Sequence, residues 1–297
     1  MSAALPKAGG GRPLVDGEFP LFIEDFRAIA AMLHADAGIS LSEAKATLVY
    51  SRLAKRLRTL GLRSFREYRA LVASHEGGEE RRQMLTALTT NLTRFFREPH
   101  HFEHLKTAVL PRLLQEARRG GRVRLWSAAC STGQEPYSLA LTILSLMPDA
   151  AGLDIKVLAT DIDPAVLAEA RAGVYEEASI EPVPSDLRKR WFNRATDARG
   201  RAGWSVAEDA RRLVSFRELN LIGAWPMKRR FQAVMCRNVV IYFDEDTQVA
   251  LWSRFMPLVE PGGHLYIGHS ERLAGDAARH FESAGITTYR RRVEGRP

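Results

Sequence analysis

The sequence has few cysteines and no long apolar run. Its 297 residues include two cysteines, Cys130 and Cys236, and neither belongs to a CxxC pair or lies beside clustered histidines. A disulfide framework and a zinc site therefore have no support, and a reducing cytoplasm is the expected location. The apolar stretch 137–147 is too short to span a membrane, and the N-terminus lacks the apolar core of a signal peptide. We expect neither membrane insertion nor export.

The sequence has an excess of positive charge. Lys and Arg number 43 against 35 Asp and Glu, which gives a net charge of +8. Most of the excess lies in residues 45–69, where eight basic residues accompany one acid, Glu67. Otherwise the composition, with 45% apolar and 26% charged residues, is that of an ordinary globular protein. An anionic partner is expected, such as a nucleic acid, a membrane surface or an acidic protein.

Helical periodicity dominates the first part of the chain. Apolar residues within 22–33 share one face, and Gly38 is expected to end that helix. Two further segments begin with a serine followed three residues later by a glutamate, the spacing of a capping box. They predict helices over about 43–60 and 65–75.

A helix is predicted from Pro99 to about Ala117, and the pattern then changes to short apolar runs that alternate with helical stretches. Strands are predicted over 123–128, 155–160, 213–216, 231–236 and 265–268. This alternation predicts an α/β domain with a largely parallel sheet covered on both faces, and with the ligand beyond the carboxyl ends of the strands. The predicted organisation is a flexible lead over 1–18, an all-helical domain over 19–89, a hinge over 90–100, the α/β domain over 101–292 with an insertion at about 186–212, and a tail over 293–297.

The first predicted strand leads into a loop of small residues, 127–133, and then into a helix with Pro136 near its start. Small side chains let a ligand approach the backbone and the N-terminus of the helix. Gly133 is the one glycine in a place where a dinucleotide fingerprint has three. An ordinary strand-to-helix turn is therefore an equal alternative for this loop taken alone.

The second predicted strand ends at Asp161, where an acidic side chain can accept both hydroxyls of a ribose. The alternative role is a helix N-cap before Pro164, for which Asp163 is better placed. A ribose-binding acid without phosphate-binding glycines favours an adenosyl ligand that carries no phosphate. S-adenosylmethionine is such a ligand.

Four ordered motifs resemble those of the bacterial chemotaxis receptor glutamate O-methyltransferases, the CheR-type family. The motifs are residues 90–98, 129–138, 161–163 and 236–239, and the resemblance covers about residues 19–292. It implies a class I, Rossmann-like methyltransferase domain with a small inserted β-subdomain, preceded by an all-α domain. It also implies S-adenosylmethionine-dependent methylation of chemoreceptor glutamates, which gives γ-methyl esters and S-adenosylhomocysteine.

The resemblance also implies site residues. The family's cofactor contacts fall on Asn91, Thr93, Arg97, Glu135, Asp161, Asn220, Leu221, Arg237 and Asn238. Arg97 is expected to bind a carboxylate, either of the cofactor or of the incoming glutamate, and Glu135 to bind the cofactor's ammonium. The alternative for Arg97 is an ion pair with Glu98 or Glu103. Tyr242 is expected to orient the attacking carboxylate, with packing as the alternative. Arg97 and Tyr242 are the candidate catalytic residues, and no metal is expected.

The basic segment suggests a surface for docking the substrate protein. Arg52, Lys55 and Arg56 lie at i, i+3 and i+4 of a predicted helix. The opposite face is an apolar stripe of Leu53, Leu57 and Leu60. This basic face is expected to attract acidic methylation helices of a chemoreceptor. A merely solvated basic face is the alternative.

Two other functions stay open. A nucleic-acid methyltransferase would place the basic segment on phosphates, but residues 236–239 lack the Asn/Asp-Pro-Pro-aromatic run common in base N-methyltransferases. A signalling adaptor without turnover is the third function. The expected protein is a monomeric cytoplasmic enzyme with chemoreceptors as partners and no bound nucleic acid.

Overall fold

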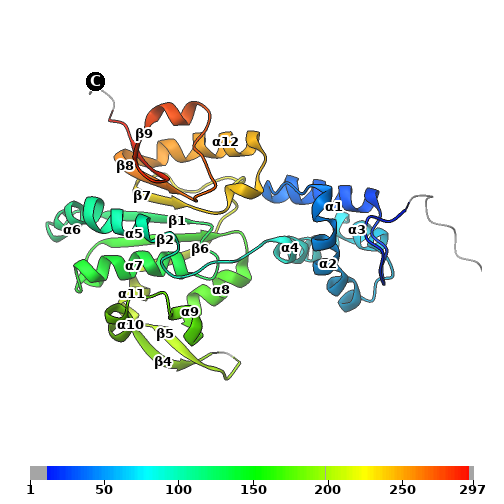
Figure 1. The fold of residues 1–297 in the computed structure, drawn as a ribbon, viewed down its shortest axis with the longest axis horizontal. Coiled ribbons are helices and arrows are strands. Elements are labelled where there is room, and N and C mark those ends of the chain that lie inside the picture. Colours follow the sequence, from blue (N-terminus) through cyan, green and yellow to red (C-terminus); the bar gives the residue numbers. More distant parts are fainter. Residues whose placement is uncertain (1–11, 198, 294–297) are drawn as a thin grey trace, which may run out of the picture. The chain divides into compact units, whose positions relative to one another are not determined.

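The computed structural model describes residues 12–197 and 199–293, and the chain divides into two compact units (Figure 1). Unit 1 is Met1–Thr90 and unit 2 is Asn91–Pro297. The division falls inside the predicted hinge 90–100. The residues outside the description are 1–11, 198 and 294–297, which include most of the predicted lead and tail.

Unit 1 is helical, as predicted. Its helices are α1 (Ile23–Ala37), the 3₁₀ turn η1 (Glu43–Lys45), α2 (Ala46–Leu60), α3 (Phe65–Ala73) and α4 (Gly78–Leu88). Gly38 adopts the left-handed conformation that ends α1. Ser64 accepts a hydrogen bond from the backbone N–H of Glu67, so the second capping box is confirmed. The first, from Ser40 to Glu43, is wrong, because the residue that precedes η1 is Ser42, and Ser42 makes no side-chain capping bond.

Unit 2 alternates helices and strands. Its first half contains α5 (Pro99–His104), η2 (Leu105–Val109), α6 (Leu110–Arg118), β1 (Val123–Ala128), α7 (Gln134–Leu146), η3 (Ala150–Gly152), β2 (Ile155–Asp161), α8 (Pro164–Ala172), β3 (Val174–Tyr175) and α9 (Glu177–Ile180). Its second half contains α10 (Ser185–Trp191), β4 (Phe192–Thr196), β5 (Ala202–Val206), α11 (Glu208–Leu213), β6 (Val214–Glu218), β7 (Phe231–Cys236), η4 (Val240–Tyr242), α12 (Glu245–Phe255), η5 (Met256–Leu258), β8 (Val259–Ile267), η6 (Asp276–His280), β9 (Phe281–Gly285) and β10 (Thr288–Arg291).

The main sheet has the strand order β6-β2-β1-β7-β8-β10-β9. Strands β6, β2, β1, β7 and β8 are parallel, which confirms the predicted sheet, and β10 is antiparallel to both β8 and β9. Because the parallel strands share one direction, the loops after β1, β2, β6, β7 and β8 meet at one edge, which we call the carboxyl rim.

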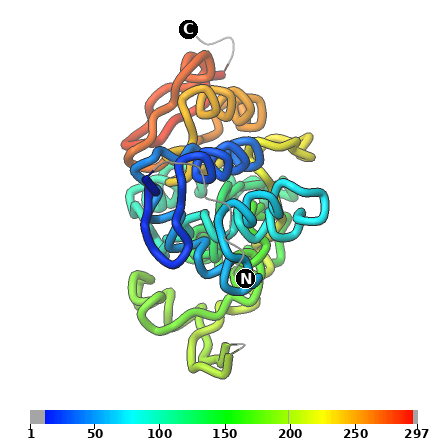
Figure 2. Tube along the Cα trace, turned by 90° about the vertical axis from the view of Figure 1, so that its right-hand side faces the viewer, coloured from blue at the N-terminus to red at the C-terminus, as the bar shows by residue number. Residues whose placement is uncertain are grey.

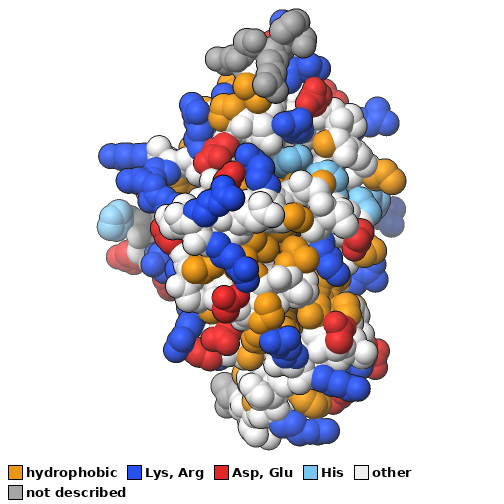
Figure 3. All heavy atoms as spheres, turned by 90° about the vertical axis from the view of Figure 1, so that its left-hand side faces the viewer, with side chains coloured by type: hydrophobic (Ala, Val, Ile, Leu, Met, Phe, Trp, Pro, Cys, Tyr) orange, Lys and Arg blue, Asp and Glu red, His pale blue; other side chains and the backbone are white. Residues whose placement is uncertain are grey.

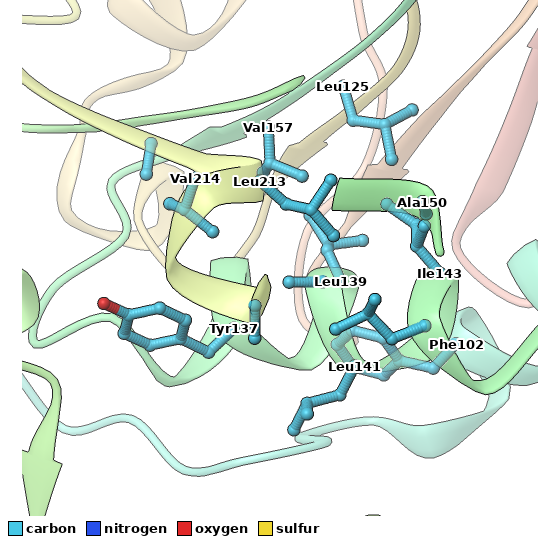
Figure 4. Close-up of a cluster of buried hydrophobic side chains, with 14 of the residues drawn as sticks. Phe102, Leu125, Tyr137, Leu139, Leu141, Ile143, Ala150, Val157, Leu213 and Val214 are labelled. Atoms are coloured by element: carbon cyan, nitrogen blue, oxygen red, sulfur yellow. The ribbon is translucent and has the colours of Figure 1, made fainter. Parts of the chain in front are cut away.

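Both faces of the sheet are covered. Leu125 of β1 and Val157 of β2 pack with Leu139 and Ile143 of α7 in one apolar cluster (Figure 4). The next residue of β1, Trp126, points to the opposite face, because successive side chains of a strand alternate. There its ring lies 5.0 Å from that of Phe255 in α12. The predicted two-sided cover is therefore confirmed.

The predicted insertion forms part of a second, three-stranded sheet with the order β3-β5-β4. In both ribbon and tube views this sheet projects from the main sheet of unit 2 (Figure 2). Strand β3, at 174–175, precedes the predicted insertion, so the sheet is assembled from segments on either side of α9 and α10. Strands β4 and β5 form its antiparallel hairpin.

One face of unit 2 carries charged side chains of both signs. On the face drawn in Figure 3, Lys and Arg side chains are dispersed, with Asp and Glu between them. In the described part of the chain, no helix combines the length and apolar character needed to cross a bilayer.

Candidate functional site

The carboxyl rim of the main sheet carries unusual backbone geometry. Positive φ angles occur at the non-glycine residues Ala129, Ser131 and Asn238 of its loops, and at Phe96 and Glu98 of the segment 91–98 that packs against it. Such conformations cost about 1–3 kcal/mol each and persist where the surrounding structure enforces them, often at functional sites. The rim is therefore the candidate functional site.

Asp161 lies at the end of β2 and is 7% exposed. One carboxylate oxygen accepts the N–H of Ser131 at 2.8 Å, and the other accepts the N–H of Asp163 at 3.0 Å. Burial raises the pKa of Asp161, and these backbone hydrogen bonds oppose that rise. Asp163 caps α8 by accepting the N–H of Ala165, so the sequence assigned the N-cap to the correct aspartate. The carboxylate of Asp161 retains acceptor sites at the rim.

The segment that begins at Asn91 packs against the loop after β1. The Asn91 amide donates to Asp163 at 3.3 Å, and the Asn91 carbonyl accepts from the hydroxyl of Ser131 at 3.1 Å. Thr93 is half-buried. These contacts bring Asn91 to the same edge as Asp161.

Arg237, after β7, forms a buried ion pair with Glu135 on α7. The Arg237 Nε lies 2.7 Å from Glu135 Oε2, and Glu135 Oε1 accepts the hydroxyl of Ser127 at 2.7 Å. Arg237 Nη1 also donates to the Arg97 carbonyl at 2.6 Å. Glu135 thus has a protein cation beside it as well as free acceptor sites for the ammonium that the resemblance implies.

Arg97 is half-buried, and its guanidinium donates to the carbonyl of Leu92 at 3.0 Å. Within residues 12–197 and 199–293 the structure gives it no carboxylate partner, so an ion pair with Glu98 or Glu103 is not supported. The remaining donors of its guanidinium are available for another carboxylate.

The sequence did not predict the role of Glu98. Glu98 Oε1 accepts from the Asn238 amide at 3.2 Å and lies 3.0 Å from His269 Nδ1, while Glu98 Oε2 lies 3.5 Å from Arg237 Nη1. Burial alone would raise the pKa of Glu98, but the hydrogen bonds from His269 and Asn238 and the charge of Arg237 lower it. The sequence suggested Glu98 only as a partner for Arg97.

His101 is fully buried beside the same arginine. Arg237 Nη1 donates to His101 Nδ1 at 3.1 Å, and His101 Nε2 lies 2.9 Å from the Thr287 hydroxyl. Burial, followed by the charge of Arg237, lowers the pKa of His101 to about 3, so the ring is neutral at pH 7. Ligand atoms of Glu98, His100 and His101 lie within 4.8 Å of one another, but Arg237 supplies a positive charge there and we assign no metal.

The loops after β6 and β7 contain the other predicted residues. The side-chain oxygen of Asn220 accepts the N–H of Ile222 at 3.1 Å, and the carbonyl of the buried Leu221 accepts from Arg254 at 2.7 Å. Tyr242 ends η4 and is half-buried, whereas its neighbour Phe243 is buried in the core. Phe243 therefore packs in the core, whereas part of Tyr242 is open to solvent.

The predicted docking residues lie in unit 1, and two of them have internal partners. Arg52 donates to three carbonyls at the end of α4, including that of Leu88 at 3.0 Å. Arg56 pairs with the buried Glu80. Lys55 is exposed.

The apolar stripe of α2 is shorter than predicted. Leu53 and Leu57 are fully buried as expected, but Leu60 is 38% exposed, so the apolar stripe ends before it. This last expectation was wrong because α2 ends there, at Gly61.

A fully buried histidine, His101, and a half-buried one, His264, predict that acid destabilises unit 2. Burial lowers the pKa of His101 to about 3 and that of His264 to about 4, whereas an unfolded histidine has a pKa of about 6.5. The stability that each neutral histidine contributes is therefore fully present above the unfolded pKa of about 6.5. It is lost as the pH falls towards the folded pKa, because protons bind the unfolded chain first. Each histidine should cost about 2 kcal/mol between pH 7.5 and pH 5.

Urea unfolding of the wild type and of His264→Gln at both pH values measures this loss. The variant should lose about 2 kcal/mol less than the wild type on acidification, and His280→Gln, at an exposed position, should behave as the wild type. Identical pH dependence in the wild type and His264→Gln would contradict the assignment.

Comparison with known proteins shows the family of the chain. The family profile described as CheR methyltransferase, SAM binding domain, matches residues 91–290, and that described as CheR methyltransferase, all-alpha domain, matches residues 24–89. A probable chemotaxis protein methyltransferase of Rhizobium etli is 59% identical, over 89% of this chain and 98% of its own. Chemotaxis protein methyltransferase 2 of Pseudomonas aeruginosa is 44% identical, over 92% of this chain and 94% of its own.

The chemotaxis protein methyltransferase of Escherichia coli is 41% identical, over 89% of each chain. Among solved structures, the glycopeptide N-methyltransferase MtfA complexed with S-adenosylmethionine is 18% identical, over 53% of this chain and 48% of its own, with a TM-score of 0.29. The assignment rests on the family profiles and the sequence relatives. The chain belongs to the CheR methyltransferase family, with an all-α domain followed by a SAM-binding domain of class I methyltransferase fold.

Proposed function

We propose that this protein methylates glutamate side chains of chemoreceptors with S-adenosylmethionine and forms γ-glutamyl methyl esters. The observation that carries the proposal is the similarity to chemotaxis protein methyltransferases along nearly the whole chain. The protein is proposed to work in the cytoplasm as a monomer, and its partners are the cytoplasmic helices of receptors.

The donor set of the rim is compatible with this cofactor. Asp161 offers a buried carboxylate at the end of β2, and Glu135 offers another at the start of α7. The first suits the ribose hydroxyls and the second suits the ammonium. The loop 129–133 contains no basic side chain that would suit a phosphate. Asn91, Thr93, Asn220, Leu221, Arg237 and Asn238 are the other proposed contacts.

The bound cofactor would supply an electrophilic methyl group on its sulfonium. A free glutamate has a pKa of about 4.3, so the substrate is already an anion at pH 7 and needs no general base. The protein's task is then to aim this carboxylate and to exclude water.

Two side chains are proposed to aim the substrate. Arg97 has free donors that can form a charge-assisted pair with a carboxylate, and Tyr242 is partly exposed with its hydroxyl available for the same oxygen. Neither residue exchanges a proton in this scheme. The pair would hold the nucleophilic oxygen in line with the methyl group.

The three basic docking residues on α2 differ in how far their charges are already paired within unit 1. Arg52 and Arg56 already bind groups inside unit 1, and their charges therefore contribute both to that unit's stability and to its surface potential. Lys55 has an exposed side chain on the same helix. We propose that Lys55 is the member of the three that contacts an acidic receptor helix most directly, with the neighbouring arginines adding long-range attraction.

Incubation with methyl-labelled S-adenosylmethionine tests the function. Label transferred to a receptor fragment and released as methanol by base would support a glutamyl ester. Label in RNA would instead indicate a nucleic-acid methyltransferase, and no transfer to any acceptor would indicate an adaptor. Receptor fragments with the candidate glutamates changed to alanine serve as controls.

Charge reversal at Lys55 should weaken receptor methylation. Lys55→Glu is expected to raise the KM for the receptor by about threefold to tenfold at low salt, since it repels an acidic helix, and the effect should shrink as salt is added. Affinity for S-adenosylhomocysteine should stay unchanged. Lys189→Glu, exposed on α10, is the matched control. Equal KM values for Lys55→Glu and the wild type would remove Lys55 from the docking surface.

A further inference from the structure

Glu271 is a buried carboxylate that the proposed chemistry does not use. It follows β8 and is 4% exposed. In the part of the chain that the structure describes, no cation pairs with it. Burial raises the pKa of Glu271, while the hydrogen bonds that it accepts oppose the rise. A buried carboxylate without a cation is costly, so its partners indicate what it does.

The partners of Glu271 are backbone N–H groups of two loops. Glu271 Oε1 accepts from Val239 at 2.9 Å and from Val240 at 3.0 Å, and Oε2 accepts from Gly268. A carboxylate offers two acceptor-only oxygens, whereas a glutamine of the same length would turn an NH₂ toward one of these donors. Both side-chain atoms at this position must therefore accept hydrogen bonds, one from the loop after β7 and the other from the loop after β8, as the two oxygens of a carboxylate do.

The loop after β8 is fitted closely to the loop after β7. A Cβ at Gly268 would lie 2.6 Å from Asn238 Nδ2 and 2.8 Å from the Asn238 nitrogen. Asn238 has a φ of 59°, and its amide is held by Glu98. The strained turn at Asn238 is thus fixed on one side by Glu98 and on the other by Glu271.

The turn that Glu271 holds leads directly into Tyr242. The N–H of Tyr242 donates to the carbonyl of Val239 at 3.2 Å, and Val240 begins η4. The peptide units bound by Glu271 therefore set the direction of the short helix that carries the tyrosine.

We propose that Glu271 is a positioning residue that fixes the turn 239–242 and, through it, the hydroxyl of Tyr242 at the site of methyl transfer. The second half of this proposal rests on the proposed function, while the first half does not. Displacement of an aligning group by about 1 Å can cost 10²-fold in rate, so a loosened turn should reduce turnover more than binding.

Hydrogen–deuterium exchange of the intact protein tests the first half without any substrate. Glu271→Gln should speed amide exchange in peptides that cover 238–243 and leave β1, at 123–128, unchanged. Glu282→Gln, at a half-exposed position on β9, is the matched control and should match the wild type. Unchanged exchange over 238–243 would overturn the proposal whatever the enzyme methylates.

A double-mutant cycle with Tyr242→Phe tests the second half. Glu271→Gln should lower kcat for receptor methylation by about 10- to 100-fold and change the affinity for S-adenosylhomocysteine by a smaller factor, because Glu98 still holds the amide of Asn238. Glu271→Gln/Tyr242→Phe should be no slower than Tyr242→Phe, because Glu271 acts through the tyrosine. Additive losses of kcat in the double variant, or a wild-type kcat in Tyr242→Phe, would overturn the second half of the proposal.

If Glu271→Gln does not fold, Glu271→Asp keeps the charge, withdraws both oxygens by one methylene, and enters the same exchange and kinetic measurements. Absence of receptor methylation by the wild type would refute the proposed function alone, since the exchange measurement would still decide the role of Glu271.

Discussion

Arg237→Met should lower the free energy of unfolding by about 3–5 kcal/mol, because removing one member of a buried ion pair leaves an uncompensated charge. The Arg237 side chain is 2% exposed, and its acidic neighbours Glu135 and Glu98 are 10% and 11% exposed. Both carboxylates would remain buried without their cation. Urea unfolding at pH 7.5, followed by circular dichroism, measures the change.

Two further variants separate loss of charge pairing from loss of volume. Arg237→Met/Glu135→Gln removes one buried charge together with its partner and should recover part of the stability. Arg118→Met removes an exposed arginine, 3.7 Å from Asp149, and should change stability by no more than about 0.5 kcal/mol. A loss below about 1 kcal/mol in Arg237→Met would show that the pair does not hold the rim together.

Asp161→Asn should weaken the binding of S-adenosylhomocysteine by about 100-fold. The asparagine turns an NH₂ toward the N–H of either Ser131 or Asp163, both of which are donors. It also removes the charge from an acceptor proposed to bind two ribose hydroxyls, and hydrogen bonds to charged groups contribute about 1.5–3 kcal/mol each. Isothermal titration calorimetry gives the dissociation constant directly.

The control for this variant is Asp186→Asn, at an exposed position on α10. It makes the same chemical change away from the rim and should bind the product as the wild type does. A dissociation constant of Asp161→Asn within about threefold of the wild type would show that Asp161 only supports the loop after β1 and does not contact the cofactor.

The central strands could be predicted because they are continuous apolar runs. Strands β1 and β7 were predicted with their observed bounds, since parallel strands buried on both faces have few polar residues. Periodicity gave no bounds for β3, β4, β5, β9 and β10, although the resemblance implied a β-subdomain over about 186–212, where β4 and β5 lie. Strands β4, β5, β9 and β10 span only four or five residues each, and apart from β9 their burial does not alternate regularly, which gives a weak signal in charged segments.

The site could be predicted only in part. Each predicted cofactor residue lies on the carboxyl rim or in the segment that packs against it, because parallel strands bring their ends together. The partners of these residues could not be predicted. Glu98 meets Asn238 and His269, and Glu271 meets Val239, across separations that no local pattern records. The basic face of α2 was likewise overestimated, since Arg56 pairs with Glu80.

The sequence by itself determined the two kinds of domain, the parallel core of the sheet and the edge at which polar groups gather. These features follow from periodicity, capping residues and strand direction, which act over short stretches of chain. Tertiary structure alone decided which buried charges meet: Arg237 with Glu135 and Glu98, and Glu271 with two loops. The reason is that burial makes an unpaired charge costly, and its partner can come from any segment that folding brings within reach.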